Sequence, residues 1–233
     1  MHFKFKLISD FFGLIYPNTC AACGNNLYKN ENIICTKCLY ELPKTNYYKE
    51  TGNPVEQIFW GRVNIERACS YYFFHKGSKF RKLIHKLKYK GQKEIGFEIG
   101  RHFGSELIGS DFINDVDVIV PVPIHPSRKR HRGYNQCDWI GMGMSESLDM
   151  PLDTKNFYRN VATETQTKKS RFERWKNVEN VFSVKDEAAF LNKHILLIDD
   201  VLTTGATLEA CASSLLKVEG VKVSIATLAV TDS

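Results

Sequence analysis

Two adjacent carboxylates, Asp199 and Asp200, form the most informative chemical feature of the sequence. They directly follow the apolar run Ile195–Ile198, which predicts a buried strand. Ligands of a parallel sheet bind outside the carboxyl ends of its strands, so we expect these groups at a binding edge. A loop follows them, composed of Val201, Leu202, Thr203, Thr204, Gly205, Ala206 and Thr207. Its backbone N–H groups, its hydroxyls and the dipole of the following helix would hold a dianionic phosphate.

The two aspartates suit a sugar beside that phosphate. Carboxylates accept hydrogen bonds from vicinal ribose hydroxyls, either directly or through a magnesium ion. The alternative is a strand-end turn with acidic caps, because an Asp-Asp pair alone is common. The complete run from strand to helix is far more specific than that pair. It predicts a ribose-phosphate site in which Asp199 and Asp200 bind magnesium through the ligand.

Four cysteines form a second constellation. Cys20 and Cys23 make one tight pair, and Cys35 and Cys38 make another, with residues 24–34 between them. Soft thiolates in a four-sulfur set favour tetrahedral zinc, which would supply folding energy to a segment poor in apolar residues. A redox dithiol or an iron–sulfur site needs a different setting and spacing. We therefore predict a closed, structural zinc site that takes no part in catalysis.

A basic stretch between His75 and Lys93 contains no acidic residue. Such a run is usually one solvated face of a helix, and Leu83, Ile84 and Leu87 would dock that helix through an apolar stripe. The alternative is a face for single-stranded nucleic acid, because tyrosines interleave with these cations. The candidate contacts to DNA phosphates are Lys79, Lys82, Lys86, Lys88 and Lys90.

The hydrophobic pattern alternates between strands and helices, which argues for an α/β domain with a mainly parallel sheet. The expected strands cover residues 68–74, 116–120, 178–184, 194–198 and 221–230. The expected helices cover residues 3–15, 78–88, 94–108, 135–147 and 206–218. The polar stretch Lys44–Pro54 reads as a linker. We accordingly divide the chain into residues 1–55, an N-terminal helix with a four-cysteine zinc-ribbon domain, and residues 56–233.

The composition excludes disordered and fibrous classes. Of the 233 residues, 43% are hydrophobic and 25% are charged, and the net charge of +6 favours an anionic partner without requiring one. No run approaches the roughly 20 apolar residues that cross a bilayer. Asp10 interrupts the first apolar run and no small-residue cleavage site follows it. We therefore expect a cytoplasmic protein without membrane insertion, in which paired cysteines indicate metal rather than disulfides.

Several motifs resemble known families. Residues 195–208 resemble the phosphoribosyl-pyrophosphate signature of the type I phosphoribosyltransferases. Asp117–Pro123 is similar to the strand and pyrophosphate loop of the amidophosphoribosyltransferases, whose flexible hood corresponds in position to Arg159–Phe182. Combined with the cysteine pairs, further motifs resemble the ComF/GntX family over nearly the whole chain. These motifs are Pro17–Cys20, Leu87–Gly91, Arg128–Gln136, Gln166-Thr167 and Arg174–Val178.

The resemblance implies a type I phosphoribosyltransferase-like fold, with a mainly parallel sheet flanked by helices and a small N-terminal domain that binds zinc through the four cysteines. It implies phosphoribosyl pyrophosphate, or a ribose-5-phosphate-like ligand, on the loop at residues 201–207 and on Pro121, Val122 and Pro123. Arg128 and Arg132 would join Asp199 and Asp200 as catalytic residues, because arginine fits the oxygens of a pyrophosphate leaving group bidentately.

The resemblance also implies a biological role in natural competence. Uptake or processing of single-stranded DNA, together with competence proteins, is the role associated with the family. Two alternatives stay open at this point. One is an active phosphoribosyltransferase of nucleotide or salvage metabolism, and the other is a sensor that binds the phosphosugar without turning it over.

Overall fold

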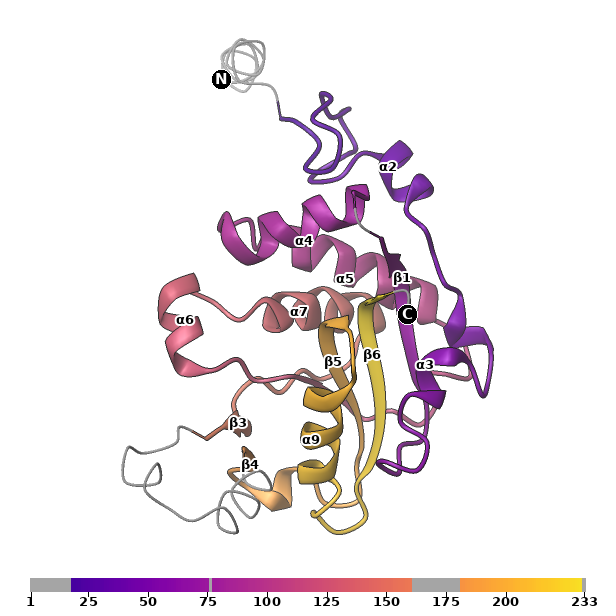
Figure 1. Ribbon diagram of the computed structural model, residues 1–233, viewed down its shortest axis with the longest axis vertical. Coiled ribbons are helices and arrows are strands. Elements are labelled where there is room, and N and C mark those ends of the chain that lie inside the picture. The colour runs from indigo at the N-terminus through magenta and orange to yellow at the C-terminus, as the bar shows by residue number, and fades with distance from the viewer. Residues whose placement is uncertain (1–17, 76, 161–180, 232–233) are drawn as a thin grey trace, which may run out of the picture.

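A computed structural model of the chain describes residues 18–75, 77–160 and 181–231 (Figure 1). Its centre is a sheet of four strands in the order β1-β6-β5-β2, and every neighbouring pair is parallel. The strands are β1 (Ala68–Phe74), β2 (Val118–Pro121), β5 (His194–Leu202) and β6 (Lys222–Thr231). This arrangement confirms the predicted α/β class and its mainly parallel sheet.

Helices cover both faces of this sheet. Side chains of a strand alternate between its two faces, so Leu196 and Ile198 enter one core cluster while Ile195 and Leu197 enter the other. The first cluster is closed by α4 (Lys79–Tyr89), α5 (Glu94–Leu107) and α7 (Gln136–Leu148). The second is closed by α9 (Ala206–Leu215), with α3 (Pro54–Gln57) at its edge. Strand β5 is therefore buried on both sides, which fixes the position of the carboxylates at its end.

Close packing of α5 against α7 depends on glycine. A Cβ atom at Gly100 would lie 2.2 Å from the carbonyl oxygen of Ile140, and one at Gly143 would lie 2.0 Å from that of Phe97. Backbone atoms cannot yield to such contacts, so only glycine allows this approach. The pairing matters for the site because the first turn of α7 carries side chains that reach the aspartates.

The first described segment, residues 18–42, contains the four cysteines and the short helix α2 (Thr36–Glu41). It docks on α4, where Lys86 Nζ donates a hydrogen bond to the Ala21 carbonyl at 2.8 Å and Lys79 pairs with Glu41. No helix in the described part of the chain is long and apolar enough to span a membrane.

The stretch Lys44–Pro54 is not the linker that its polar composition predicted. The Thr45 amide donates to the Tyr71 carbonyl at 3.0 Å, and the Phe73 amide donates to the Pro43 carbonyl at 2.9 Å. The 3-10 helix η1 (Tyr47–Lys49) follows this pairing. The stretch thus lies along the edge of β1. Its polar composition reflects the exposure of one side to solvent and not a flexible connection between domains.

The structure differs from the sequence prediction in three further places. Strand β5 continues through the two aspartates to Leu202, four residues beyond the predicted end at Ile198. The cations after the pyrophosphate-like loop form a helix, α6 (Pro126–Arg132). A small antiparallel pair joins β3 (Phe157–Arg159) to β4 (Phe182–Val184), and the 3-10 helix η3 (Glu187–Ala189) follows. The predicted first helix at 3–15 and most of the hood, residues 161–180, lie outside the described residues.

Candidate functional site

The turn between β5 and α9 presents a row of unpaired backbone donors. Gly205 precedes α9 with φ 77°, a left-handed conformation that favours glycine. Among described residues, no hydrogen bond uses the backbone N–H groups of 203–207 as donors. Thr203, Thr204, Ala206 and Thr207 are exposed there. A row of free N–H groups at a helix start is an arrangement that binds phosphate.

The two predicted carboxylates lie in β5, shortly before this turn; α7 contacts both of them, and α4 contacts Asp200. Asp199 is half-buried, and its Oδ1 accepts hydrogen bonds from the Asp200 amide at 2.8 Å and from the Cys137 thiol at 3.2 Å. Asp200 is only 4% exposed. Its Oδ2 accepts a hydrogen bond from Gln136 Nε2 at 2.9 Å and pairs with Lys88 Nζ at 2.8 Å. Helices α7 and α4 therefore meet at the aspartates.

Within the described residues, the negative charge of the two aspartates is only partly balanced. Burial, and after it the neighbouring charge of Asp200, raises the pKa of Asp199 to about 7. Three smaller effects lower this pKa and partly offset the rise: hydrogen bonds from the Asp200 amide and the Cys137 thiol, and the positive charge of Lys88. One lysine thus faces two carboxylates. A bound cation beside Asp199 would satisfy the remaining negative charge.

Of the two arginines predicted to be catalytic, only Arg132 contacts the carboxylate cluster in the structure. Arg132 is half-buried, its guanidinium lies 5.8 Å from the centre of the Tyr89 ring, and it donates a hydrogen bond to Gln136 Oε1. Because Gln136 in turn donates to Asp200, Arg132 joins the carboxylate cluster through one intermediate. Arg128 lies on the same helix, exposed.

The predicted pyrophosphate loop lies one strand away from the aspartates. Pro121 is paired with Ile198, and the Val122 amide donates to the Ile198 carbonyl at 2.9 Å. Asn135 Nδ2 holds the Val122 carbonyl at 3.1 Å. Pro121 and Pro123 also line a cavity of about 350 Å³. Its charged and polar lining comprises Lys129, Arg130, Asn135, Asp138, Lys155 and Arg159.

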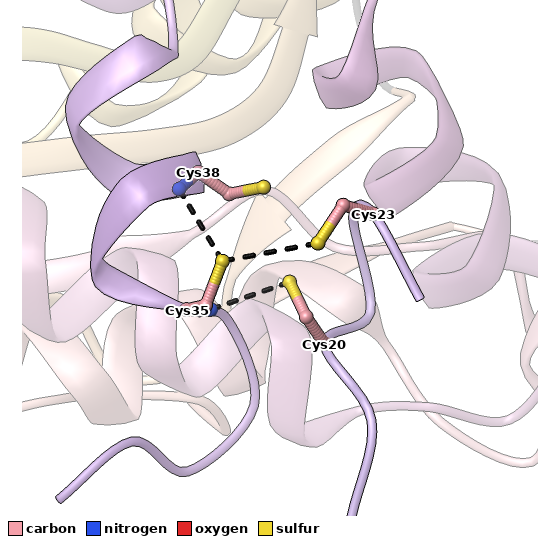
Figure 2. Close-up of side chains that lie close together, drawn as sticks. All are labelled: Cys20, Cys23, Cys35 and Cys38. Atoms are coloured by element: carbon pink, nitrogen blue, oxygen red, sulfur yellow. Dashed lines mark hydrogen bonds between the residues drawn. The ribbon is translucent and has the colours of Figure 1, made fainter. Parts of the chain in front are cut away.

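The four cysteines converge on one point (Figure 2). All four sulfur atoms lie within 4.8 Å of one another, and the Sγ atoms of Cys23 and Cys35 are 3.8 Å apart. Tetrahedral zinc with bonds of about 2.3 Å would hold its sulfurs roughly 3.8 Å apart. Burial raises the pKa of Cys20, but backbone N–H groups, first that of Cys35, outweigh it and lower the pKa to about 6. The cluster could therefore hold a metal ion.

A basic groove lies between residues 21–24 of the cysteine-containing segment and helix α4. We call it the α4 groove; it measures about 660 Å³, its cations are Arg81, Lys82, Lys86 and Lys90, and His85 also lines it. Of the five lysines predicted to meet DNA, Lys82, Lys86 and Lys90 line this groove. Lys79 instead pairs with Glu41, and Lys88 pairs with Asp200. The structure thus divides the predicted DNA face among three places.

Sequence reasoning missed three side chains of the carboxylate cluster. Lys88 was assigned to DNA, while Gln136 and Cys137 were assigned no role. Gln136 carried a usable signal, because a buried glutamine in the first turn of a helix needs a polar partner. No local pattern distinguishes Lys88 from the other lysines of α4.

Comparison with known proteins supports the fold and gives the family. Residues 140–232 match the family described as Phosphoribosyl transferase domain. "DNA utilization protein YhgH" of Escherichia coli is 32% identical over 202 residues, which cover 85% of this chain and 84% of that protein. "Competence protein F" of Haemophilus influenzae is 26% identical over 215 residues, 85% of this chain and 90% of that protein. "Competence protein ComFC" of Bacillus subtilis is 33% identical over 137 residues, 59% and 53% of the two chains. Such identity over most of both chains, on a phosphoribosyltransferase domain preceded by paired cysteines, shows that this protein belongs to the ComF/ComFC-like family.

Proposed function

We propose that this protein binds phosphoribosyl pyrophosphate, together with magnesium, at the end of β5. The observation that carries the proposal is the position of two carboxylates at the end of β5, three residues before a row of amide donors that have no acceptor among the described residues. The N–H groups of residues 203–207 suit the 5′-phosphate, and half-buried Asp199 can accept the ribose hydroxyls. A ribose 5-phosphate derivative carries both kinds of group on one short molecule.

The other end of the ligand would lie toward the loop after β2 and α6. The Val122 amide donates a hydrogen bond to the carbonyl of Ile198, the residue before Asp199, so that loop lies next to the carboxylates. Arg132 reaches the same cluster through Gln136, and its guanidinium would balance pyrophosphate charge. Magnesium, when bound with the ligand, supplies further positive charge, and the oxygen atoms of Asp199 and Asp200 suit this hard cation.

The cysteine cluster fits structural zinc. Sulfur fills all four ligand positions, which leaves no open position for a substrate. The amides of Cys35 and Cys38 donate to the Sγ atoms of Cys20 and Cys35 at 3.3 and 3.4 Å, and such bonds stabilise thiolate ligands. The ion would hold residues 18–42 in the shape that docks on α4.

A role in DNA utilization or competence follows from the names of the relatives and is supported by the α4 groove. Arg81, Lys82 and Lys90 are exposed in this groove. No ion pair within the described part of the chain engages these three side chains. Free cations along a groove suit the phosphates of a single strand. Lys88 serves the phosphosugar site instead, because its charge is committed to Asp200.

A second candidate function is transfer of the phosphoribosyl group to an acceptor. The cavity of about 350 Å³ beside the loop after β2 favours it, because apolar walls and four cations meet there. The walls include Pro121, Ile124 and Phe157, and the cations are Lys129, Arg130, Lys155 and Arg159. Such a cavity suits a planar, anionic acceptor.

Calorimetry with phosphoribosyl pyrophosphate and magnesium tests the ligand. We expect Asp199→Asn combined with Asp200→Asn to weaken binding at least tenfold, or about 1.4 kcal/mol. The matched control combines Asp111→Asn with Asp115→Asn, which removes the same charge from exposed positions. Equal affinity of the wild type and the site variant would place the ligand elsewhere. Repetition with a single-stranded oligonucleotide shows whether the two ligands share this surface.

A further inference from the structure

A turn at residues 58–62, which precedes β1, lies behind the phosphate-binding loop. A Cβ atom at Gly205 would lie 3.0 Å from Ile58 Cγ2 and 3.2 Å from Phe59 Cε1. Phe59 is fully buried. Position 205 therefore combines a left-handed backbone with a packed rear side, and both conditions favour glycine. The loop rests on this turn.

Arg62 extends from the turn to the loop and to the following helix. Its Nη1 donates hydrogen bonds to the carbonyl oxygens of Ile58 at 3.1 Å and Thr204 at 2.9 Å. Its Nη2 forms an ion pair with Glu209, in the first turn of α9. One guanidinium thus connects its own turn to the loop and first helical turn around Thr204 and Glu209, more than 140 positions away in the sequence, and its planar fork suits such multiple contacts.

The contact with Thr204 fixes the direction of a peptide group. In a trans peptide, the carbonyl and the following N–H point in opposite directions. Because the Thr204 carbonyl points to Arg62, the Gly205 N–H points away from it. That N–H has no acceptor within the described part of the chain. A reversed peptide would direct a carbonyl oxygen at the phosphate and repel it.

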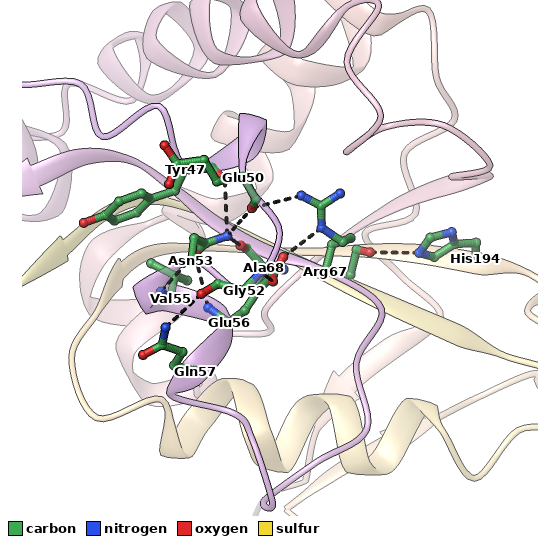
Figure 3. Close-up of polar contacts among 11 residues, drawn as sticks. Tyr47, Glu50, Gly52, Asn53, Val55, Glu56, Gln57, Arg67, Ala68 and His194 are labelled. Atoms are coloured by element: carbon green, nitrogen blue, oxygen red, sulfur yellow. Dashed lines mark hydrogen bonds and ion pairs between the residues drawn. The ribbon is translucent and has the colours of Figure 1, made fainter.

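Helix α3, which leads into the turn that carries Arg62, is held by a set of polar contacts (Figure 3). Buried Asn53 accepts hydrogen bonds from the Val55 and Glu56 amides, and its Nδ2 donates to the Ala68 carbonyl at 2.9 Å. Glu56 accepts a hydrogen bond from Arg67 Nε at 2.8 Å. These contacts join α3 to the start of β1, so both ends of the segment that carries Arg62 are held in the folded chain.

We propose that Arg62 is a positioning residue that holds the Thr204–Gly205 peptide ready for a phosphate monoester. The inference rests on the proposed function, because it requires the 5′-phosphate to bind on residues 203–207. It adds a residue from outside the loop and outside α9, joined to Thr204 and Glu209 across the fold.

Ribose 5-phosphate alone, without magnesium, is the probe, because it carries one phosphate group. In calorimetry we expect Arg62→Met to bind it at least tenfold more weakly than the wild type. Arg62→Lys keeps one donor and should recover part of the loss, and Glu209→Gln should lose less than Arg62→Met. Lys193→Met, exposed and located at the opposite end of β5 from the loop, should bind normally.

A spectroscopic readout separates positioning from stability. The amide signal of Gly205 should shift on addition of ribose 5-phosphate in the wild type and shift much less in Arg62→Met. A structural role alone would lower the melting temperature and leave affinity and this shift unchanged, which would overturn the inference. Absence of ribose 5-phosphate binding to the wild type would overturn the proposed function itself. If Arg62→Met does not fold, the comparison of Arg62→Lys with Glu209→Gln decides.

Discussion

The ion pair between Lys88 and Asp200 determines how firmly α4 is joined to the carboxylate cluster. Lys88 Nζ lies 2.8 Å from Asp200 Oδ2 and 3.0 Å from Oδ1, and the two side chains are 22% and 6% exposed. Removal of one partner from a buried pair costs about 3–5 kcal/mol, because the other charge stays buried and unpaired. Gln136 still donates to Asp200 and water reaches Lys88, so we expect a smaller loss of roughly 2 kcal/mol for Lys88→Met.

Urea unfolding of four proteins measures this coupling: the wild type, Lys88→Met, Asp200→Asn and the double variant. In the Asp200→Asn background, Lys88→Met should cost less than about 1 kcal/mol, because a neutral amide needs no counter-charge. Lys90→Met is the matched control, at the residue that directly follows α4; Lys90 is exposed, and its replacement should change stability by no more than about 0.5 kcal/mol. An equal cost of Lys88→Met in both backgrounds would refute the ion-pair reasoning and attribute the loss to packing.

Three other predictions concern the rest of the molecule. Elemental analysis should find about one zinc per chain in the wild type and none in Cys35→Ser, since a tetrahedral site needs all four thiolates; iron in its place would contradict the assignment. Changing Arg81, Lys82 and Lys90 together to Ala should lower the salt slope of single-strand affinity by roughly two in fluorescence anisotropy. The matched triple change of Lys185, Lys193 and Lys217 should leave that slope unchanged. Equal slopes in both triple variants would show that the α4 groove does not bind the strand. Hydrogen bonds from His102 and then Arg101 lower the pKa of Glu98 from 4.5 to about 2. Its ionised form therefore stabilises the fold above about pH 4.5, and roughly 3 kcal/mol is lost as the pH falls to about 2. Glu98→Gln should flatten that part of an acid-unfolding profile, and an unchanged profile would show that the fall comes from other carboxyl groups.

The sequence predicted most elements of the central sheet because burial leaves a visible apolar pattern. Strand β1 has the predicted bounds, Ala68–Phe74, since it is buried from Ala68 to Tyr72 and half-buried at its last two residues. Strand β5 was predicted too short because the aspartates interrupt the apolar run. Its ladder nevertheless continues, with Asp199 opposite Thr227 and Leu202 opposite Val230, since backbone pairing does not require apolar side chains.

Helix α6 escaped prediction for the opposite reason. It buries no residue, so it has no apolar stripe that a periodicity could reveal. Its ends define it instead: the His125 side chain accepts a hydrogen bond from the Ser127 amide, Pro126 fills the first turn, and Gly133 closes the helix at φ 86°. These capping residues were present in the sequence, but the sequence analysis assigned no secondary structure to residues 126–132.

The candidate site was predictable only where neighbours in sequence act together. The carboxylates and the amide loop are contiguous, and both cysteine pairs are local, so each could be recognised from spacing. Arg62 and Thr204 are separated by 142 positions, and Lys88 and Asp200 by 112. Nothing near Arg62 or Lys88 indicates those partners, because only the fold brings them together.

The predicted DNA face and the predicted phosphosugar site meet on one helix. Lys86 and Lys88 are two positions apart in α4, so they project in different directions. Lys86 holds the cysteine segment through the Ala21 carbonyl, whereas Lys88 holds Asp200. Leu83 and Leu87 are fully buried between these contacts and fix the helix against the sheet. Helix α4 therefore connects the cysteine segment to the carboxylate cluster, and displacement of the whole helix would change both contacts.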